Sequence, residues 1–241
     1  MSASFQQVLP LFGSVRSAGR RPTILLLLAP VFCTAFRYWG SPRYYQAHVQ
    51  AHLVLFGDPA WTASAWAFVA PILTLALPAL AVSALRPRER LVDNGLGLGN
   101  WRFGIKAAAA LAPLMLVASF FAAGLPAFRV EYPYWPGAGA SATRFAAHAG
   151  LYLVYYVGYE AYFRGFLQCG LRRRLGDIDA VLVQTLATTL VHIGKPVGEI
   201  LGAIPAGLVW GALALRAGSI WPVVLVHWLL GASLDFFILF G

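Results

Sequence analysis

Charged residues are scarce in this chain. Only 11% of its 241 residues are Asp, Glu, Lys or Arg, whereas a soluble globular domain carries about 25%. Hydrophobic residues make up 59% of the sequence. This composition excludes an ordinary soluble domain and predicts an integral membrane protein that crosses the bilayer several times.

Cysteine, the usual source of cross-links and of soft metal ligands, is almost absent. The two cysteines, Cys33 and Cys169, lie far apart in apolar runs, so the sequence predicts neither a disulfide framework nor a thiolate metal site. A serine nucleophile is missing as well, because Gly231-Ala232-Ser233 does not lie in a strand-to-helix elbow. The remaining candidates for chemistry are carboxylates and imidazoles.

Negative charge is the scarcer sign. Nine acidic residues stand against 18 basic ones, which gives a formal net charge of +9. Such an excess could indicate a nucleic-acid partner, but the basic residues cluster at the ends of apolar runs, where the positive-inside rule expects them. We therefore expect the lipid bilayer as a partner and no nucleic acid.

Seven apolar runs are long enough to be membrane helices. They are 22–39, 62–85, 104–124, 146–170, 178–193, 199–215 and 219–240. The sequence thus predicts an all-α polytopic protein with about seven transmembrane helices in a single membrane domain over residues 1–241.

The basic residues also predict the orientation of the chain. Twelve lie in segments assigned to the cytoplasm: Arg16, Arg20, Arg21, Arg86, Arg88, Arg90, Arg102, Lys106, Arg172, Arg173, Arg174 and Arg216. Five lie in segments assigned to the outside: Arg37, Arg43, Arg129, Arg144 and Lys195. This bias favours a cytoplasmic N-terminus. Because arginine outnumbers lysine so strongly, we expect a multi-pass protein of a bacterial plasma membrane.

The most informative stretch is Tyr159–Phe166, with the sequence YEAYFRGF. It places a carboxylate, Glu160, four residues before a guanidinium, Arg164, within an otherwise apolar run. On a helix this spacing puts both side chains on one face, one turn apart. Each charge costs roughly 2.5–3.5 kcal/mol at the centre of a bilayer on insertion scales. A chain that keeps both charges there is expected to use them.

The apolar runs after this motif contain few further ionisable side chains. With the loop between them they hold His192, Lys195, Glu199, His227 and Asp235. One carboxylate with two imidazoles can activate water and stabilise an oxyanion, or it can bind a divalent metal such as zinc. Both arrangements hydrolyse amide bonds, and the sequence leaves the choice open. The candidate catalytic residues are Glu160, Arg164, His192 and His227, and the candidate metal ligands are Glu160, His192 and His227.

The order of these motifs resembles the CPBP family, the intramembrane proteases related to type II CAAX prenyl endopeptidases and Abi proteins. The family pattern is E-E-x-x-x-R, then F-x-x-x-H, then H-x-x-x-N or D. The resemblance covers residues 146–241, whereas residues 1–145 hold generic spans. It implies an intramembrane endopeptidase in which Glu160 acts as general base or metal ligand and Arg164 orients it. His192 would bind water or metal, and His227 would stabilise the oxyanion.

The match to this pattern is partial. The family's first glutamate, thought to activate the water, falls on Tyr159, and the phenylalanine of the second motif falls on Thr188. The Asn or Asp of the third motif falls on Gly231. Supporting roles could be filled by Tyr159, Glu199, Lys195 or Asp235.

Three functions therefore stay open. The first is an intramembrane protease, of metallo or glutamic type, acting on a peptide or a membrane-protein substrate. The second is a catalytically inactive scaffold that keeps the fold and binds partner proteins. The third and weaker one is a proton-coupled transporter, because proton relays also use buried glutamate and histidine. Prenylation of the substrate does not follow from the resemblance.

Overall fold

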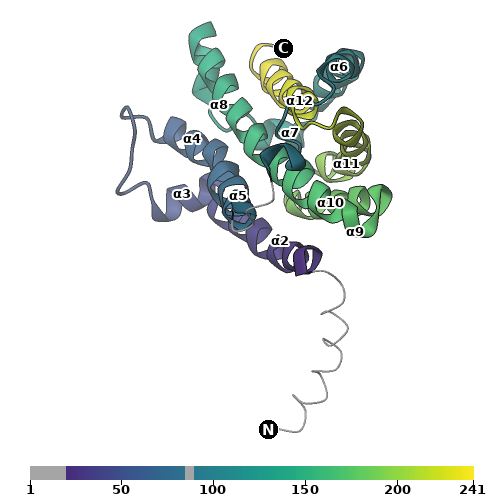
Figure 1. Ribbon diagram of the computed structural model, residues 1–241. Helices are drawn as coiled ribbons and strands as arrows, with labels where there is room; N and C mark the ends of the chain where they lie inside the picture. The colour runs from purple at the N-terminus through teal and green to yellow at the C-terminus, as the bar shows by residue number, and fades with distance from the viewer. Residues whose placement is uncertain (1–19, 85–89) are drawn as a thin grey trace, which may run out of the picture.

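A computed structural model describes residues 20–84 and 90–241, and every regular element in these ranges is a helix (Figure 1). The α-helices are α2 (Arg20–Trp39), α3 (Pro42–His48), α4 (Pro59–Pro71), α5 (Leu77–Ala84), α6 (Trp101–Ala123), α7 (Pro126–Glu131), α8 (Ala142–Glu160), α9 (Gly170–Leu175), α10 (Asp177–Val191), α11 (Val197–Ala217) and α12 (Trp221–Phe240). The π-helices are η2 (Ile72–Ala76) and η5 (Ala161–Cys169), and the 3-10 helices are η3 (Leu91–Asn94) and η4 (Pro136–Ala140). The predicted all-α fold is confirmed. Arg16, Arg86 and Arg88 lie outside the described residues.

Five helical segments are long and apolar enough to cross a membrane. They are Pro22–Trp39, Pro59–Ala84, Trp101–Ala123, Val197–Ala217 and Trp221–Phe240. The chain is thus a multi-pass membrane protein. The expected fourth and fifth spans correspond to α8–η5–α9 and to α10, which are helical but are not among these five. The exact number of seven spans is therefore not established.

Helix boundaries follow local sequence signals. The Asp58 carboxylate accepts a hydrogen bond from the backbone N–H of Trp61 and so caps α4, which begins with Pro59. The Ser141 hydroxyl caps α8 in the same way. Gly218 ends α11 in the left-handed conformation, at φ 61°, that glycine adopts without strain. Turn residues thus divide the apolar sequence into separate helices.

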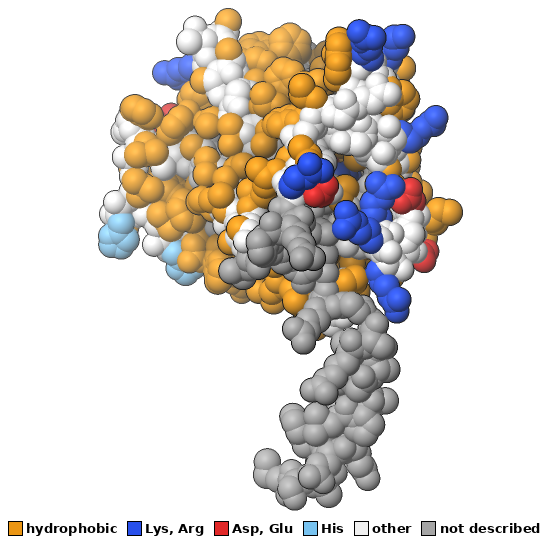
Figure 2. Space-filling model, in the orientation of Figure 1, with side chains coloured by type: hydrophobic (Ala, Val, Ile, Leu, Met, Phe, Trp, Pro, Cys, Tyr) orange, Lys and Arg blue, Asp and Glu red, His pale blue; other side chains and the backbone are white. Residues whose placement is uncertain are grey.

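The outside of the bundle is apolar. Hydrophobic side chains cover most of the face seen in Figure 2, and the basic side chains visible there lie mainly on its right half. Helix α6 illustrates this surface, because its large side chains Leu114, Phe120 and Phe121 are 58%, 59% and 70% exposed. In water such a surface would be an aggregation hazard, whereas in a bilayer it contacts lipid.

Helix α8 lies at the centre of the bundle, between α4 on one side and α12 on the other (Figure 1). Helices α6 and α12 pack along each other, as do α10 and α11. The largest apolar core forms around η5, where Tyr162, Phe163 and Leu167 are fully buried against α2 and α5. The motif Tyr159–Phe166 therefore lies within the largest apolar core of the described residues.

Candidate active site

The central motif lies where α8 changes from α-helix to π-helix. Residues Ala142–Leu175 form one continuous helix whose middle section, η5, is π-helical. Glu160 is the last α-helical residue, and Arg164 lies within η5. The Arg164 Nη1 atom is 3.2 Å from Glu160 Oε1 and 3.1 Å from Glu160 Oε2. Both residues are buried, at 0% and 1% exposure, so the pair expected from the spacing forms away from water.

His227, on α12, binds the same carboxylate. Its Nδ1 atom lies 2.6 Å from Glu160 Oε1. Since an ionised carboxylate only accepts hydrogen bonds, Nδ1 carries the proton, and Nε2 is left for other partners. The imidazole lies between Tyr156 and Trp210, at centroid distances of 4.1 and 4.3 Å. Glu160 and these two rings therefore fix both the tautomer and the orientation of His227.

His192 is oriented by a backbone carbonyl. It follows the last residue of α10, and its Nδ1 atom lies 2.6 Å from the carbonyl oxygen of Thr188. A carbonyl oxygen can only accept, so Nδ1 is again the protonated nitrogen. His192 Nε2 lies 3.7 Å from Glu199 Oε1. Each histidine thus uses Nδ1 for positioning and leaves Nε2 available for chemistry.

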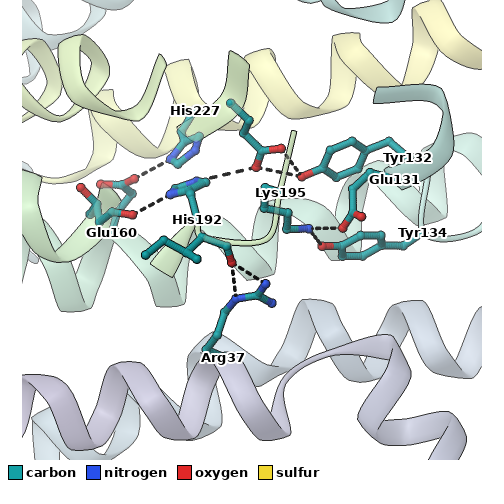
Figure 3. A network of polar contacts seen from close by, with 11 residues as sticks. Arg37, Glu131, Tyr132, Tyr134, Glu160, His192, Lys195 and His227 are labelled. Carbon is teal, nitrogen blue, oxygen red and sulfur yellow. Dashed lines mark hydrogen bonds and ion pairs between the residues drawn. The ribbon is translucent and has the colours of Figure 1, made fainter. Parts of the chain in front are cut away.

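Both imidazoles line one cavity of about 390 Å³. Figure 3 shows them between Glu160 on one side and Lys195 with Tyr132 on the other. Tyr159, Glu199 and Lys195 line the same cavity, whereas the buried Glu160 and Arg164 do not. Six of the lining residues are tyrosines: Tyr132, Tyr134, Tyr152, Tyr155, Tyr156 and Tyr159. The arrangement combines aromatic walls with a few directed polar groups, as substrate sites do.

The loop after α10 forms one side of this cavity through Lys195. The Lys195 ammonium pairs with the Glu131 carboxylate and contacts the Tyr134 hydroxyl. Burial lowers the pKa of Lys195, but the neighbouring Tyr134, Glu199 and Glu131 outweigh that effect and raise the pKa above its usual value. Lys195 therefore stays charged and holds the loop to the segment after α7.

A second contact joins the same two segments. The Tyr132 hydroxyl is 2.9 Å from Glu199 Oε1 and 3.0 Å from Glu199 Oε2 (Figure 3). Burial raises the pKa of Tyr132 well above its ordinary value, so this phenol remains a donor. Sequence reasoning missed Glu131 and Tyr132. A signal was present in the polar and aromatic run Glu131–Trp135, which is unusual for a loop that only connects helices.

Asp235 does not join the other candidates. Its Oδ2 atom lies 2.7 Å from His148 Nε2, and both side chains are 1% exposed. This pair links α12 to α8, and neither residue lines the cavity. His192 and His227 thus line the cavity, and Glu160 with Arg164 lies directly behind His227. Asp235 lies in a separate buried pair.

Comparison with known families matches the part of the chain that contains this cavity's two histidines. Residues 141–233 match the family model described as type II CAAX prenyl endopeptidase Rce1-like. The match covers less than half of the chain and supports assignment of this region to the CAAX-protease type of family. It contains Glu160, Arg164, His192 and His227, and it ends before Asp235. Searches of curated proteins and of solved structures gave no significant match. The Rce1-like family is a family of proteases, and this supports protease activity for the membrane-embedded chain.

Two of the three departures from the family pattern, Tyr159 and Gly231, lie next to aromatic side chains of the cavity wall. Tyr159 is 2% exposed, and its ring lies 5.6 Å from that of His227 and 6.3 Å from that of His192. At Gly231, an added Cβ would lie 2.2 Å from the Tyr156 hydroxyl oxygen. The Tyr159 side chain and the Tyr156 hydroxyl therefore fill the space at these two positions.

The donor set does not fit a protein-bound metal ion. Within residues 20–84 and 90–241, no group of three or more His, Cys, Asp or Glu side chains is arranged to hold one. A Zn²⁺ ion in a hydrolase takes three protein ligands. The candidate ligand Glu160 is instead engaged by His227 and Arg164.

Proposed function

We propose that this protein is an intramembrane endopeptidase that hydrolyses a peptide bond in a peptide or membrane-protein substrate. One observation carries the proposal. Two histidines, each positioned through Nδ1, line a single cavity in the Rce1-like region of a membrane-spanning bundle. Amide hydrolysis needs a positioned water and a group that stabilises the oxyanion, and two oriented imidazoles supply such groups.

The buried pair acts through His227. Glu160 lies behind the cavity wall, where its carboxylate accepts the hydrogen bond from His227 Nδ1 and so directs His227 Nε2 away from itself. A protonated His227 can donate from Nε2 to the oxygen that becomes negative as water adds to the carbonyl carbon. Arg164 holds the Glu160 carboxylate in place. His192 presents an unprotonated Nε2 that can accept a hydrogen bond from the attacking water.

The test is cleavage by the purified full chain in lipid vesicles. A library of membrane-anchored peptides, with and without a prenylated C-terminal cysteine, is incubated with wild type and with His227→Ala, and products are read by mass spectrometry. We expect cleavage by wild type and a loss of at least about 100-fold with the variant. No cleavage of any peptide by a folded wild-type protein would reject the proposal.

A second candidate is an inactive scaffold that binds membrane partners. It is favoured by Tyr159 and Gly231, the two positions at which the polar residues of the family pattern are replaced. A scaffold would bind peptides from the same library without cleaving them. Its cellular function would also survive His227→Ala, whereas that of a protease would not.

A further inference from the structure

One chemical role has no residue assigned to it in the proposed site. The position that the family pattern gives to the water-activating glutamate holds Tyr159. That ring is packed against Phe36 and Phe163, and a buried phenol is a poor acceptor of a proton from water. Another group at the cavity must therefore take that proton.

Two carboxylates line the cavity among the residues that the structure describes, Glu131 and Glu199. The Lys195 ammonium pairs directly with Glu131, so this carboxylate is neutralised at the edge of the site. Glu199 has no such direct ion pair with a lysine or arginine in the described part of the chain. Its nearest basic nitrogen is His192 Nε2, at 3.7 Å. Glu199 is therefore the carboxylate available beside a candidate catalytic histidine.

The position of Glu199 is fixed by the loop before α11. Gly194 turns the chain at φ 92°, a conformation that favours glycine. Arg37 then donates from Nε and Nη2 to the carbonyl oxygen of Ile193, at 3.2 and 2.7 Å. The contact between Lys195 and Glu131 holds the same loop from the other side (Figure 3). As a result, Glu199 in the first turn of α11 faces back toward His192.

The distance between Glu199 and His192 suits a bridging water. At 3.7 Å the two atoms are too far apart for a direct hydrogen bond, and both are acceptors when Glu199 is ionised and His192 Nδ1 carries the proton. One water molecule can donate one hydrogen to each of them. The Tyr132 hydroxyl donates to the Glu199 carboxylate from the other side and holds it in this position.

We propose that Glu199 is the general base of this hydrolase and takes the place of the carboxylate that is missing at position 159. This inference rests on the proposed endopeptidase function and names the group that activates its water. A base outside the E-x-x-x-R motif is compatible with the tyrosine at position 159, because the reaction needs a carboxylate at the water and not at a particular point in the chain.

With Glu199 as the base, amide hydrolysis proceeds in two steps. Glu199 takes one proton from the water while the water oxygen bonds to the carbonyl carbon of the scissile amide, and the carbonyl electron pair moves to oxygen. The resulting oxyanion is stabilised by His227. When the C–N bond breaks, the proton held by Glu199 passes to the leaving nitrogen. The products are a carboxylic acid and an amine, and Glu199 returns to its ionised form.

The deciding experiment compares Glu199→Gln with Asp177→Asn. Each replaces a carboxylate in the first turn of its helix by the matching amide, but Asp177 pairs with Arg172 and does not line the cavity. With the best-cleaved library peptide in lipid vesicles, we expect Glu199→Gln to lower kcat about 10²–10⁴-fold with KM unchanged. Asp177→Asn should leave kcat within about threefold of wild type.

The outcomes separate this inference from the function on which it rests. If Glu199→Gln cleaves the peptide as well as wild type does, Glu199 is not the base, but the proposed endopeptidase function is unaffected. A wild type that cleaves nothing would overturn both. An equal loss of kcat in Asp177→Asn would also reject Glu199 as the base, because the loss would then follow from removing any negative charge at the start of a helix. If Glu199→Gln does not fold, Glu199→Asp keeps the charge and shortens the side chain. It should lower kcat at least tenfold, and wild-type kcat in that variant would reject the base.

Discussion

At the scale of single residues, the ion pair of Glu160 and Arg164 has the largest consequences. Both side chains are buried, and the carboxylate also binds His227. Replacing Glu160 by glutamine leaves the guanidinium without a counter-charge, which typically costs about 3–5 kcal/mol when the site is buried. We expect Glu160→Gln to lower the thermal unfolding temperature in detergent and to reduce kcat about 10²–10⁴-fold, because His227 loses its carboxylate.

The double variant Glu160→Gln/Arg164→Met separates these two effects. Replacing both members of a buried pair by neutral groups of similar size is often close to neutral for stability. The double variant should therefore regain most of the lost thermal stability while kcat stays low. Recovery of cleavage together with stability would mean that the pair is structural and that His227 does not depend on Glu160.

Local pairs could be read from the sequence, and distant ones could not. The contact between Glu160 and Arg164 follows from a spacing of four residues on one helix. The sequence offers both Glu199 and Asp235 as supporting carboxylates, but only Glu199 lines the cavity. What separates them is the turn at Gly194 and a buried partner for Asp235, His148, which comes from a helix far away in the chain. No spacing in the sequence encodes that partner.

At the scale of helices, α8 and η2 approach each other unusually closely. A Cβ added at Gly158 would lie 2.7 Å from the backbone nitrogen of Ile72 and 2.8 Å from the carbonyl carbon of Pro71. Backbone atoms cannot rotate away, so we expect Gly158→Ala to force the helices apart and to destabilise the fold by about 1–3 kcal/mol. Gly150→Ala on the same helix meets no atom within 4 Å. It should be neutral or stabilising in the same thermal unfolding measurement, and equal losses in the two variants would contradict this packing.

The pair of His148 and Asp235 is a second link between helices, from α8 to α12. Replacing Asp235 by alanine leaves a buried imidazole without its partner, so we expect a stability loss of about 1–3 kcal/mol. Because neither residue lines the cavity, the kcat of the folded fraction should stay within about threefold of wild type. Measuring kcat per folded molecule, with the folded fraction taken from size-exclusion chromatography, checks this. A loss of kcat at full stability would bring Asp235 into the active site.

Helices as such were predictable, but their internal geometry was not. Apolar runs and turn residues located each long helix to within a few residues, because both signals are local. The π-helical turns of η5 gave no comparable signal. They sit beside Glu160, where the close approach of η3 requires Gly165, whose added Cβ would lie 2.7 Å from the Asn94 carbonyl oxygen. Such turns depend on tertiary packing and commonly accompany functional sites.

At the scale of the whole molecule, the loops carry basic residues to which the positive-inside rule gives opposite sides of the membrane. At one end Asn100 donates its backbone N–H to Ala217, and the Arg216 guanidinium lies 5.5 Å from the Phe103 ring centroid. Arg102, at the start of α6, and Arg216, near the end of α11, belong to this end. The opposite end holds the loop after α10, where Arg37 binds the Ile193 carbonyl oxygen. The cavity is lined by Arg37, Arg43 and Lys195, which the positive-inside rule assigns to the outside.

This arrangement predicts that substrates reach the site from the non-cytoplasmic side. In intact cells, with Cys33 and Cys169 replaced by serine, a membrane-impermeant maleimide should label Arg43→Cys at the cavity. It should not label Arg173→Cys at the end of α9 until the membrane is permeabilised, because the polar reagent cannot cross the apolar interior. The reverse pattern would place the cavity on the cytoplasmic side. In that case the charge bias would reflect contacts among the loops and not the orientation of the chain in the membrane.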